Sequence, residues 1–358
     1  YHDVYTDVRG SGNIVGNKIS IAANNVENTG ADIKAQDKIE IGAKKNLVIG
    51  NLEAVDKKVR DGGKDYISDE KRTNIGSNLN AKDISLTSLG DIGITGSNIV
   101  ATNKASIQAK GDISIVAGKD SVLHEEKHSK SKGFGRSSSE ESVAYATRNV
   151  ASNIIGDKVN ITSEKDVNIF GSNIQANTEG QIKADGNITQ AGVKDINYSY
   201  HKTTKKGFMG LTSKSIMDEN YAEKAILSAT LAGNKGLTYD SKNNLILSGV
   251  KVVSSGSIDL KGKNVEINPL ETKSYNKHKE VKRGFSGSFS PKGISVSYGK
   301  DKLSLDTDIL NQTASQIISN KDINIEATDK VKAKSVDIYA KNDVNISGDN
   351  GVEISTAN

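Results

Sequence analysis

One short stretch of the chain has the spacing of a metal site. Residues 124–128 read His-Glu-Glu-Lys-His, which fits the H-E-x-x-H pattern of zinc proteases, where both imidazoles project from one face of a helix. The local sequence does not favour a helix, because the stretch follows the strand-like pair Val122 and Leu123 and runs into Ser-Lys-Ser-Lys-Gly. We therefore expect no metal site and no cofactor.

Three further stretches have residues suited to binding anions. Residues 125–134, 198–208 and 275–285 are rich in Lys, Ser or Thr, and each ends in Gly-Phe. The even recurrence of Gly-Phe indicates that these inserts share one register, and a degenerate fourth stretch occupies residues 52–71. Alternation of residue types nearby predicts that the inserts are β-hairpins or extended lips lying along the body of the protein.

Two of these inserts have a clear excess of positive charge. We expect them to contact an anionic surface, such as lipopolysaccharide or an acidic glycan. The candidate residues are Lys202, Lys205, Lys206, Phe208, Lys279, Lys282, Arg283 and Phe285. The alternative is that Lys and Ser only keep an exposed hairpin soluble and prevent edge-to-edge aggregation.

The inserts interrupt a long internal repeat. Residues 72–79, Arg-Thr-Asn-Ile-Gly-Ser-Asn-Leu, return at 147–154 as Thr-Arg-Asn-Val-Ala-Ser-Asn-Ile, and the register then holds without a gap. A fixed period, here about 75 residues, is typical of stacked repeats, in which each unit needs its neighbours to bury its apolar face. The predicted aliphatic ladder comprises Ile84, Leu86, Ile92, Ile94, Ile107, Ile113, Val159, Ile161, Val167, Ile169, Ile182 and Ile188.

A second, shorter interval is nested inside the first. Residues 84 and 86 recur as 105 and 107, and residues 323 and 325 recur as 344 and 346. Apolar residues two apart have strand periodicity. The fold prediction is therefore an all-β solenoid of parallel coils, with about 20 to 21 residues per coil and extruded β-hairpin-like inserts. An antiparallel sandwich is the competing fold.

The module boundaries follow from these intervals. We assign residues 1–50 to the first coils, 51–146 to module 1 with its inserts, 147–222 to module 2, 223–305 to module 3 and 306–358 to a partial module 4, in one continuous solenoid. Residues 218–233 resemble a capped helix but also keep the repeat register, so their secondary structure stays open.

Composition fits a long, thin core. Aromatic residues make up 4% of the chain, Trp is absent, and 34 Gly supply turns.

Without Cys there is no disulfide or Cys-based metal site. A net charge of +4 is too small to indicate nucleic acid, and no apolar run is long enough to span a bilayer. Because the chain begins at Tyr1, we expect an internal fragment of a longer protein.

The repeats resemble those of a known family. Gly-Ser-Asn at 76–78, 96–98 and 171–173, Asp-Ile-Ser-Ile at 112–115 and Asp-Val-Asn-Ile at 166–169 are similar to haemagglutinin repeats. These belong to the filamentous haemagglutinins and contact-dependent growth inhibition exoproteins of Gram-negative bacteria. The insert at 130–134 resembles the second repeat region of that family, and the opening stretch at 19–33 resembles the first.

The resemblance implies a right-handed parallel β-helix in a large protein that is secreted to the bacterial cell surface. Its expected partners are the outer-membrane transporter of a two-partner system and the outer-membrane surface or glycans of a target cell. The leading hypothesis is a non-catalytic shaft used for toxin delivery, and the alternative is an attachment adhesin. A polysaccharide-processing β-helix enzyme is a more remote alternative, because no catalytic cluster stands out from the repeats.

Overall fold

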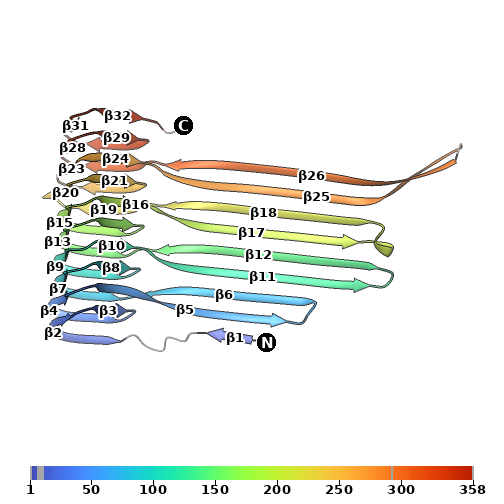
Figure 1. The fold of residues 1–358 in the computed structure, drawn as a ribbon, viewed down its shortest axis with the longest axis horizontal. Coiled ribbons are helices and arrows are strands. Elements are labelled where there is room, and N and C mark those ends of the chain that lie inside the picture. Colours follow the sequence, from blue (N-terminus) through green and yellow to red (C-terminus); the bar gives the residue numbers. More distant parts are fainter. Residues whose placement is uncertain (1, 6–11, 292, 357–358) are drawn as a thin grey trace.

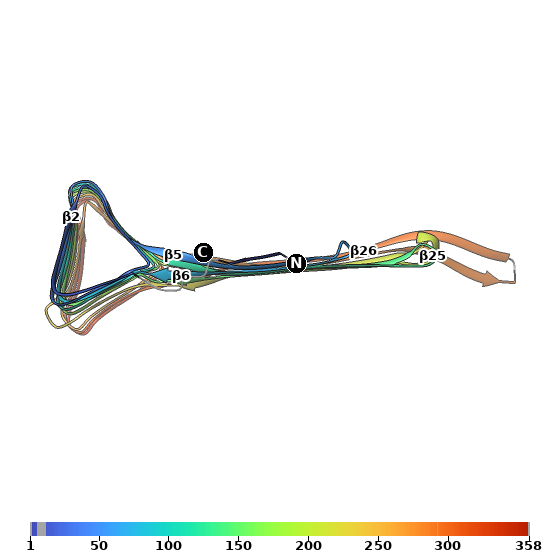
Figure 2. The same cartoon turned by 90° about the horizontal axis from the view of Figure 1, so that it is seen from below.

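The computed structural model describes residues 2–5, 12–291 and 293–356. Its body is a stack of coils with a triangular cross-section, from which a long, thin sheet projects sideways (Figures 1 and 2). The strands of successive coils pair in parallel, as in β13 (Asn153–Ser163) with β15 (Asn173–Ala184). The predicted solenoid of parallel coils is confirmed, and an antiparallel sandwich is excluded for these coils. The handedness of the coil stays a prediction.

Two sides of the triangle belong to one parallel sheet of fourteen strands. In the first coils one strand bends around the corner, with a register shift such as that between Gly156 and Lys158. In later coils two short strands replace it. The remaining strands are β2 (Asn13–Ala23), β4 (Asp32–Ala43), β7 (Asn78–Ser88), β9 (Asn98–Ala109), β19 (Ser228–Ala232), β20 (Gly236–Ser241), β22 (Val250–Ser254), β23 (Ile258–Gly262), β27 (Ser315–Ser319), β28 (Ile323–Ala327), β30 (Val336–Ala340) and β31 (Val344–Gly348).

The third side is built from short parallel strands and from the first residues of β5 (Leu47–Asp61). In most of these strands alternate residues are buried, so the buried positions stack directly over those of the coil below. The strands are β3 (Val26–Thr29), β8 (Ile92–Thr95), β10 (Ile113–Val116), β14 (Val167–Phe170), β16 (Ile188–Ala191), β21 (Asn244–Ser248), β24 (Asn264–Asn268), β29 (Val331–Lys334) and β32 (Val352–Ser355).

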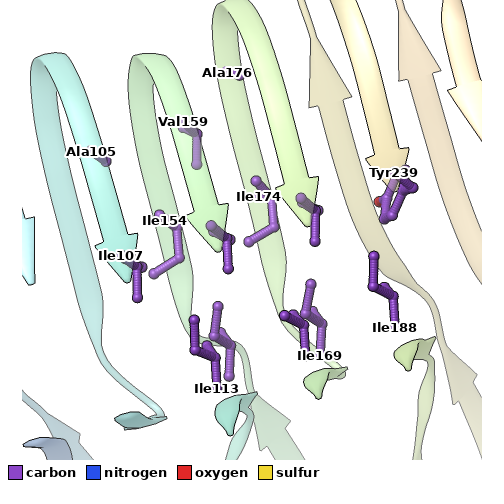
Figure 3. Packing of buried hydrophobic residues seen from close by; sticks show 14 of the residues in the cluster. Ala105, Ile107, Ile113, Ile154, Val159, Ile169, Ile174, Ala176, Ile188 and Tyr239 are labelled. Carbon is purple, nitrogen blue, oxygen red and sulfur yellow. The ribbon is translucent and has the colours of Figure 1, made fainter. Parts of the chain in front are cut away.

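The core consists of aliphatic columns that run along the stack (Figure 3). All twelve predicted ladder residues are buried, each with at most 1% of its surface exposed. In one column Ile41, Leu86, Ile107, Ile161 and Ile182 pair in turn. Because like side chains stack on like, small identical layers fill the interior without large aromatic residues.

A polar cluster interrupts the columns at one level. Tyr239 takes the ladder place between Ile182 and Leu260 and is fully buried. Its hydroxyl contacts Gln190 Oε1 at 2.5 Å and Thr230 Oγ1 at 2.7 Å, and both partners are also buried. Burial raises the pKa of the Tyr239 phenol well above its usual range. Since the hydroxyl has partners, the larger side chain is accommodated without leaving that group unsatisfied.

The recurring Gly-Ser-Asn motif forms one corner of the triangle. Ser97 is fully buried and donates to the carbonyl oxygens of Gly50 and Thr95. Asn98 donates through its side-chain amide to Asn78, and Asn153 donates to Asn98, each at 2.8 Å. The motif therefore recurs because it satisfies buried corner carbonyls and forms an amide ladder along the stack.

The inserts are antiparallel hairpins that leave the third side of every second coil. Hairpin 1 is β5 with β6 (Asp65–Gly76), hairpin 2 is β11 (Gly118–Lys132) with β12 (Arg136–Val150), hairpin 3 is β17 (Val193–Lys206) with β18 (Ser213–Ile226), and hairpin 4 is β25 (Leu270–Ser290) with β26 (Gly293–Thr313). They project away from the stack (Figure 1), so the predicted extruded β-hairpins are confirmed, and only the expectation that they lie along the stack is wrong.

Neighbouring hairpins also pair with one another. The pairs β6–β11, β12–β17 and β18–β25 are antiparallel, so the four hairpins form one continuous sheet, which we call the fin. A short N-terminal strand, β1 (His2–Tyr5), pairs with the outer side of β5. Neighbouring hairpins come within pairing distance because a two-stranded hairpin and two coils both occupy two strand spacings, about 9.6 Å.

The segment at 218–233 contains no helix. It forms most of β18 and all of β19. Both neighbours of β18 in the fin, β17 and β25, hydrogen-bond to it, and this pairing outweighs the helix propensity of its Ala and Glu residues. No helix in the described part of the chain is long and apolar enough to cross a membrane.

Candidate functional surface

The fin is a single-layer sheet, so both of its faces meet solvent (Figure 2). Alternate residues of each strand point to opposite faces. We name the faces by their residues: the tyrosine face carries Tyr145, Tyr198, Tyr221 and Tyr275, and the histidine face carries His124, His128, His201 and His278.

The four tyrosines of the first face form one cross-strand row. Tyr145 lies opposite Tyr198, which lies opposite Tyr221, which lies opposite Tyr275. The rings of Tyr221 and Tyr275 are stacked, with centroids 5.2 Å apart. Burial, with a hydrogen bond to Glu223, raises the pKa of Tyr221 to about 12. The row supplies apolar contact that a single-layer sheet otherwise lacks.

Four of the predicted basic residues form two rows near the outer end of the fin. Lys202 and Lys279 lie on either side of Met217, and Lys206 and Arg283 lie on either side of Ser213. All four lie on the tyrosine face, and within the described part of the chain they form no ion pair.

An acidic residue does lie beside one of these lysines. Lys202 is opposite Glu141 in the register between β12 and β17. The carboxylate of Glu141 pairs instead with Lys127, at 3.2 Å. The positive charge of Lys202 is therefore not neutralised by a direct contact.

The two other predicted lysines point to the opposite face. Lys205 and Lys282 lie on either side of Lys214, on the histidine face. The Glu280 carboxylate forms ion pairs with both Lys214 and Lys282, at 2.9 and 3.1 Å, and these positive charges hold the pKa of its carboxyl below the usual value. The structure thus splits the predicted patch in two, and the part on the tyrosine face is the one without ion pairs.

The predicted phenylalanines differ in position. Phe208 lies in the turn of hairpin 3, in the 3-10 segment η1 (Phe208–Gly210), and Phe134 lies in the turn of hairpin 2. Their ring centroids are 5.7 Å apart, and Met209 donates its backbone N–H to the Phe134 carbonyl. Phe285 instead lies within β25 and contacts Tyr298, because hairpin 4 extends further.

The metal-like stretch lies on an extended strand. His124 and His128 both belong to β11, where a separation of four residues spans about 13 Å. That distance is too long for two imidazoles to share one zinc ion. Each instead contacts a carboxylate of β6: His124 Nδ1 lies 2.7 Å from Asp69, and His128 Nδ1 lies 2.8 Å from Asp65.

A shallow trough of about 720 Å³ crosses the histidine face near the base of the fin. Its floor is lined by small or neutral side chains, among them Ala144, Ser199, Asn220 and Ala222. Asn220 donates to Ser199 at 3.2 Å. The trough exists because side chains in these rows are shorter than those on either side.

Sequence reasoning missed the tyrosine row and the pairing between hairpins. Tyr198 and Tyr275 each open an insert, and each occupies the same place relative to the Gly-Phe pair that closes it. This shared placement was the available signal that the two rings are equivalent.

Comparison with known proteins gives a consistent family. The family model described as Hemagglutinin repeat matches residues 60–143, 132–283 and 294–358. One curated relative, "tRNA nuclease CdiA" of Escherichia coli (strain STEC_O31), is 26% identical over 344 residues, which cover 92% of this chain and 10% of the relative. Another protein of the same name, from Yersinia mollaretii, is 27% identical over 185 residues, which cover 46% of this chain and 6% of the relative. No solved structure gives a significant match.

Proposed function

The chain belongs to the hemagglutinin repeat family, and from this premise we propose that it is a stretch of the shaft of a large secreted exoprotein that carries a toxin to a neighbouring cell. The observation that supports this proposal most directly is the match to a CdiA protein over 92% of the chain. The chain spans only a tenth of that relative, so the nuclease named in it is assigned to another part of the protein.

In this proposal the stack of coils is a structural shaft without catalytic activity. Its columns are aliphatic and buried, and its corners use Ser and Asn side chains for backbone and ladder hydrogen bonds. The expected partners are the transporter that exports the exoprotein across the outer membrane and the surface of the target cell. An adhesin without a toxin is the alternative, which the family description itself supports.

The fin supplies the contact with the target surface. Lys202, Lys206, Lys279 and Arg283 gather on the tyrosine face near its outer end without ion-pair partners among the described residues. A basic group close to an anionic membrane surface contributes about 1 kcal/mol. Four such groups therefore favour lipopolysaccharide or acidic glycans over neutral surfaces, and salt weakens the attraction.

The contact is tested with the purified chain and vesicles that contain lipopolysaccharide. Changing the four residues to Glu lowers the affinity at least about a hundredfold at low salt, from about 1 kcal/mol per lost charge. The matched control changes four exposed lysines of the coils, Lys34, Lys104, Lys110 and Lys251, to Glu. Equal binding by the two variants would show that the four basic residues of the fin do not make the contact.

Delivery is tested in the full-length parent protein on living cells. The variant of the fin lowers growth inhibition of target cells, while the amount of exoprotein on the producing cell stays unchanged. A parent protein that inhibits no neighbour, yet still binds cells through the same four residues, would instead establish the adhesin.

A further inference from the structure

The histidines of the fin share one structural role. We call the boundaries between neighbouring hairpins seams: seam 1 is β6–β11, seam 2 is β12–β17 and seam 3 is β18–β25. Seam 1 is crossed by His124–Asp69 and His128–Asp65, at 2.7 and 2.8 Å. Seam 2 is crossed by His201–Glu140 at 3.7 Å, and seam 3 by His278–Asp218 at 2.6 Å.

In the described part of the fin, most cross-strand ion pairs of lysine and arginine join the two strands of one hairpin, whereas the cross-strand histidine contacts join neighbouring hairpins. Ion pairs between the two strands of one hairpin are formed by Lys57–Glu70 and Arg72–Glu53 in hairpin 1, Lys127–Glu141 and Arg148–Asp120 in hairpin 2, and Lys194–Glu223 in hairpin 3. Across seams 1 and 2, the ion pairs found among the described residues all involve histidine. Lysine and arginine therefore join the two strands within each of these hairpins, whereas histidine contacts link neighbouring hairpins at seams 1 and 2.

The histidine face around these rings carries acidic and basic groups in nearly equal numbers. Among the described residues, Asp65, Asp69 and Glu126 form ion pairs with His124 and His128 alone, so these three carboxylates lack a direct positive partner when the two imidazoles are neutral. The charged groups that face the rings are Asp56, Lys58 and Arg60 from β5, Asp65, Asp69 and Lys71 from β6, Glu126 and Lys130 from β11, Glu140 from β12, Lys205 from β17, Lys214 and Asp218 from β18, Glu280 and Lys282 from β25, and Asp301 from β26.

The electrostatics at seam 1 agree with this geometry. The hydrogen bond with Asp69 raises the pKa of His124, and those with Asp65 and Glu126 raise the pKa of His128. A group whose pKa is raised on folding contributes stability that is fully present below its unfolded value, about 6.5 for His, and is lost as pH rises through the folded value. The contacts of His124 and His128 therefore stabilise seam 1 most in mildly acidic solution.

We propose that His124 and His128 make the cohesion of the fin at seam 1 depend on pH, strengthening the contact between hairpins 1 and 2 in mildly acidic solution and loosening it as the pH rises. The coils and hairpins 1 to 3 do not take part in this change, because the ion pairs that join the strands of these hairpins are formed by lysine and arginine.

The seams differ in how strongly they respond. Seam 1 has two short histidine contacts and no lysine pair among the described residues, so its response is the largest. Seam 3 is also crossed by Lys214–Glu280 and Lys277–Glu219 and by a hydrogen bond from Tyr275 to Glu219, so its cohesion does not depend on histidine alone.

The test is hydrogen exchange of the whole chain, read by mass spectrometry at pH 5.5 and pH 8.0 and corrected for intrinsic exchange rates. Backbone amides of residues 65–72 and 121–128 that face seam 1 lose roughly threefold to tenfold protection at the higher pH, as expected for two exposed charge pairs. Amides within the coils keep their protection. Equal protection of seam 1 at both pH values would overturn the proposal.

Two matched variants separate titration from a purely structural role. His124→Gln with His128→Gln keeps hydrogen-bonding groups but removes the dependence on pH at seam 1, whereas His201→Gln with His278→Gln leaves it intact. His124→Lys with His128→Lys keeps seam 1 protected at both pH values. A double Gln variant of seam 1 that still lost protection between pH 5.5 and pH 8.0 would also refute the role of these histidines.

Discussion

Inserting one extra coil is expected to break the fin without breaking the stack. Hairpins 1 and 2 are neighbours because two coils, residues 77–117, raise the chain by the height of one hairpin. A tandem copy of residues 77–96 adds a third coil and about 4.8 Å of height. Its buried residues, such as Leu79 and Leu86, stack on their own copies, so the core accepts it. The gap between β6 and β11 then doubles to about 9.6 Å, beyond hydrogen-bond reach.

The stabilisation that seam 1 loses in this variant can be estimated from the register between β6 and β11. Seam 1 contains eight opposed residue pairs, from Ser121–Arg72 to His128–Asp65. An antiparallel ladder averages about one backbone hydrogen bond per pair, and each contributes about 0.5–1.5 kcal/mol net. The seam therefore loses about 4–12 kcal/mol of local stabilisation, while β6 keeps its pairing with β5 and β11 keeps its pairing with β12.

Hydrogen exchange distinguishes these outcomes on the same strands. In the insertion variant, amides of β6 and β11 that point into seam 1 exchange almost as fast as unprotected peptide, while alternate amides that point to β5 and β12 stay protected. The control is a tandem copy of residues 77–151, a whole repeat unit that adds two coils and one hairpin and so keeps every seam closed. Unchanged protection at seam 1 in the single-coil variant would refute the argument from matching heights.

Three smaller predictions concern the stack, and urea unfolding of the whole chain measures each. Ile182→Ala removes a fully buried ladder side chain and lowers the free energy of unfolding by about 2–5 kcal/mol; a loss below about 1 kcal/mol would contradict column packing. Tyr239→Phe leaves Gln190 Oε1 without its shortest contact and costs about 1–3 kcal/mol, so a neutral result would show that the polar cluster is not coupled. Gly118→Ala costs about 1–3 kcal/mol because its Cβ would clash with Asn74 Oδ1, whereas Gly93→Ala, with open space, is nearly neutral; equal effects would refute the packing at this corner.

The coils were predictable because their signal is local and repeated. Ile84 and Ile107 each belong to a short alternating pattern, and the two nested intervals place such patterns over one another. The pairing of the inserts was not predictable in the same way. A partner such as Asp69 for His124 lies 55 residues away, and an alternating polar strand does not reveal which neighbour it pairs with. The module boundaries and the roles of the candidate site residues stay predictions.

The division of the basic patch has a simple cause that the sequence does contain. Lys205 and Lys206 are adjacent, so on a strand they point to opposite faces. Grouping them into one patch overlooked this alternation. The direction in which the hairpins leave the stack depends on the third side of the triangle, which no residue of the hairpin itself encodes.

The last hairpin outgrows its neighbours. β18 accompanies β25 only as far as Arg283, so among the described residues no third strand pairs with the ribbon beyond that point. Two-stranded ribbons twist more strongly than wide sheets, and the outer ends of β25 and β26 leave the plane of the other hairpins (Figure 2). This overhang exposes Ile294, Val296 and Tyr298. A surface that approaches the fin end-on therefore meets an exposed apolar tip before it comes within reach of the four basic side chains.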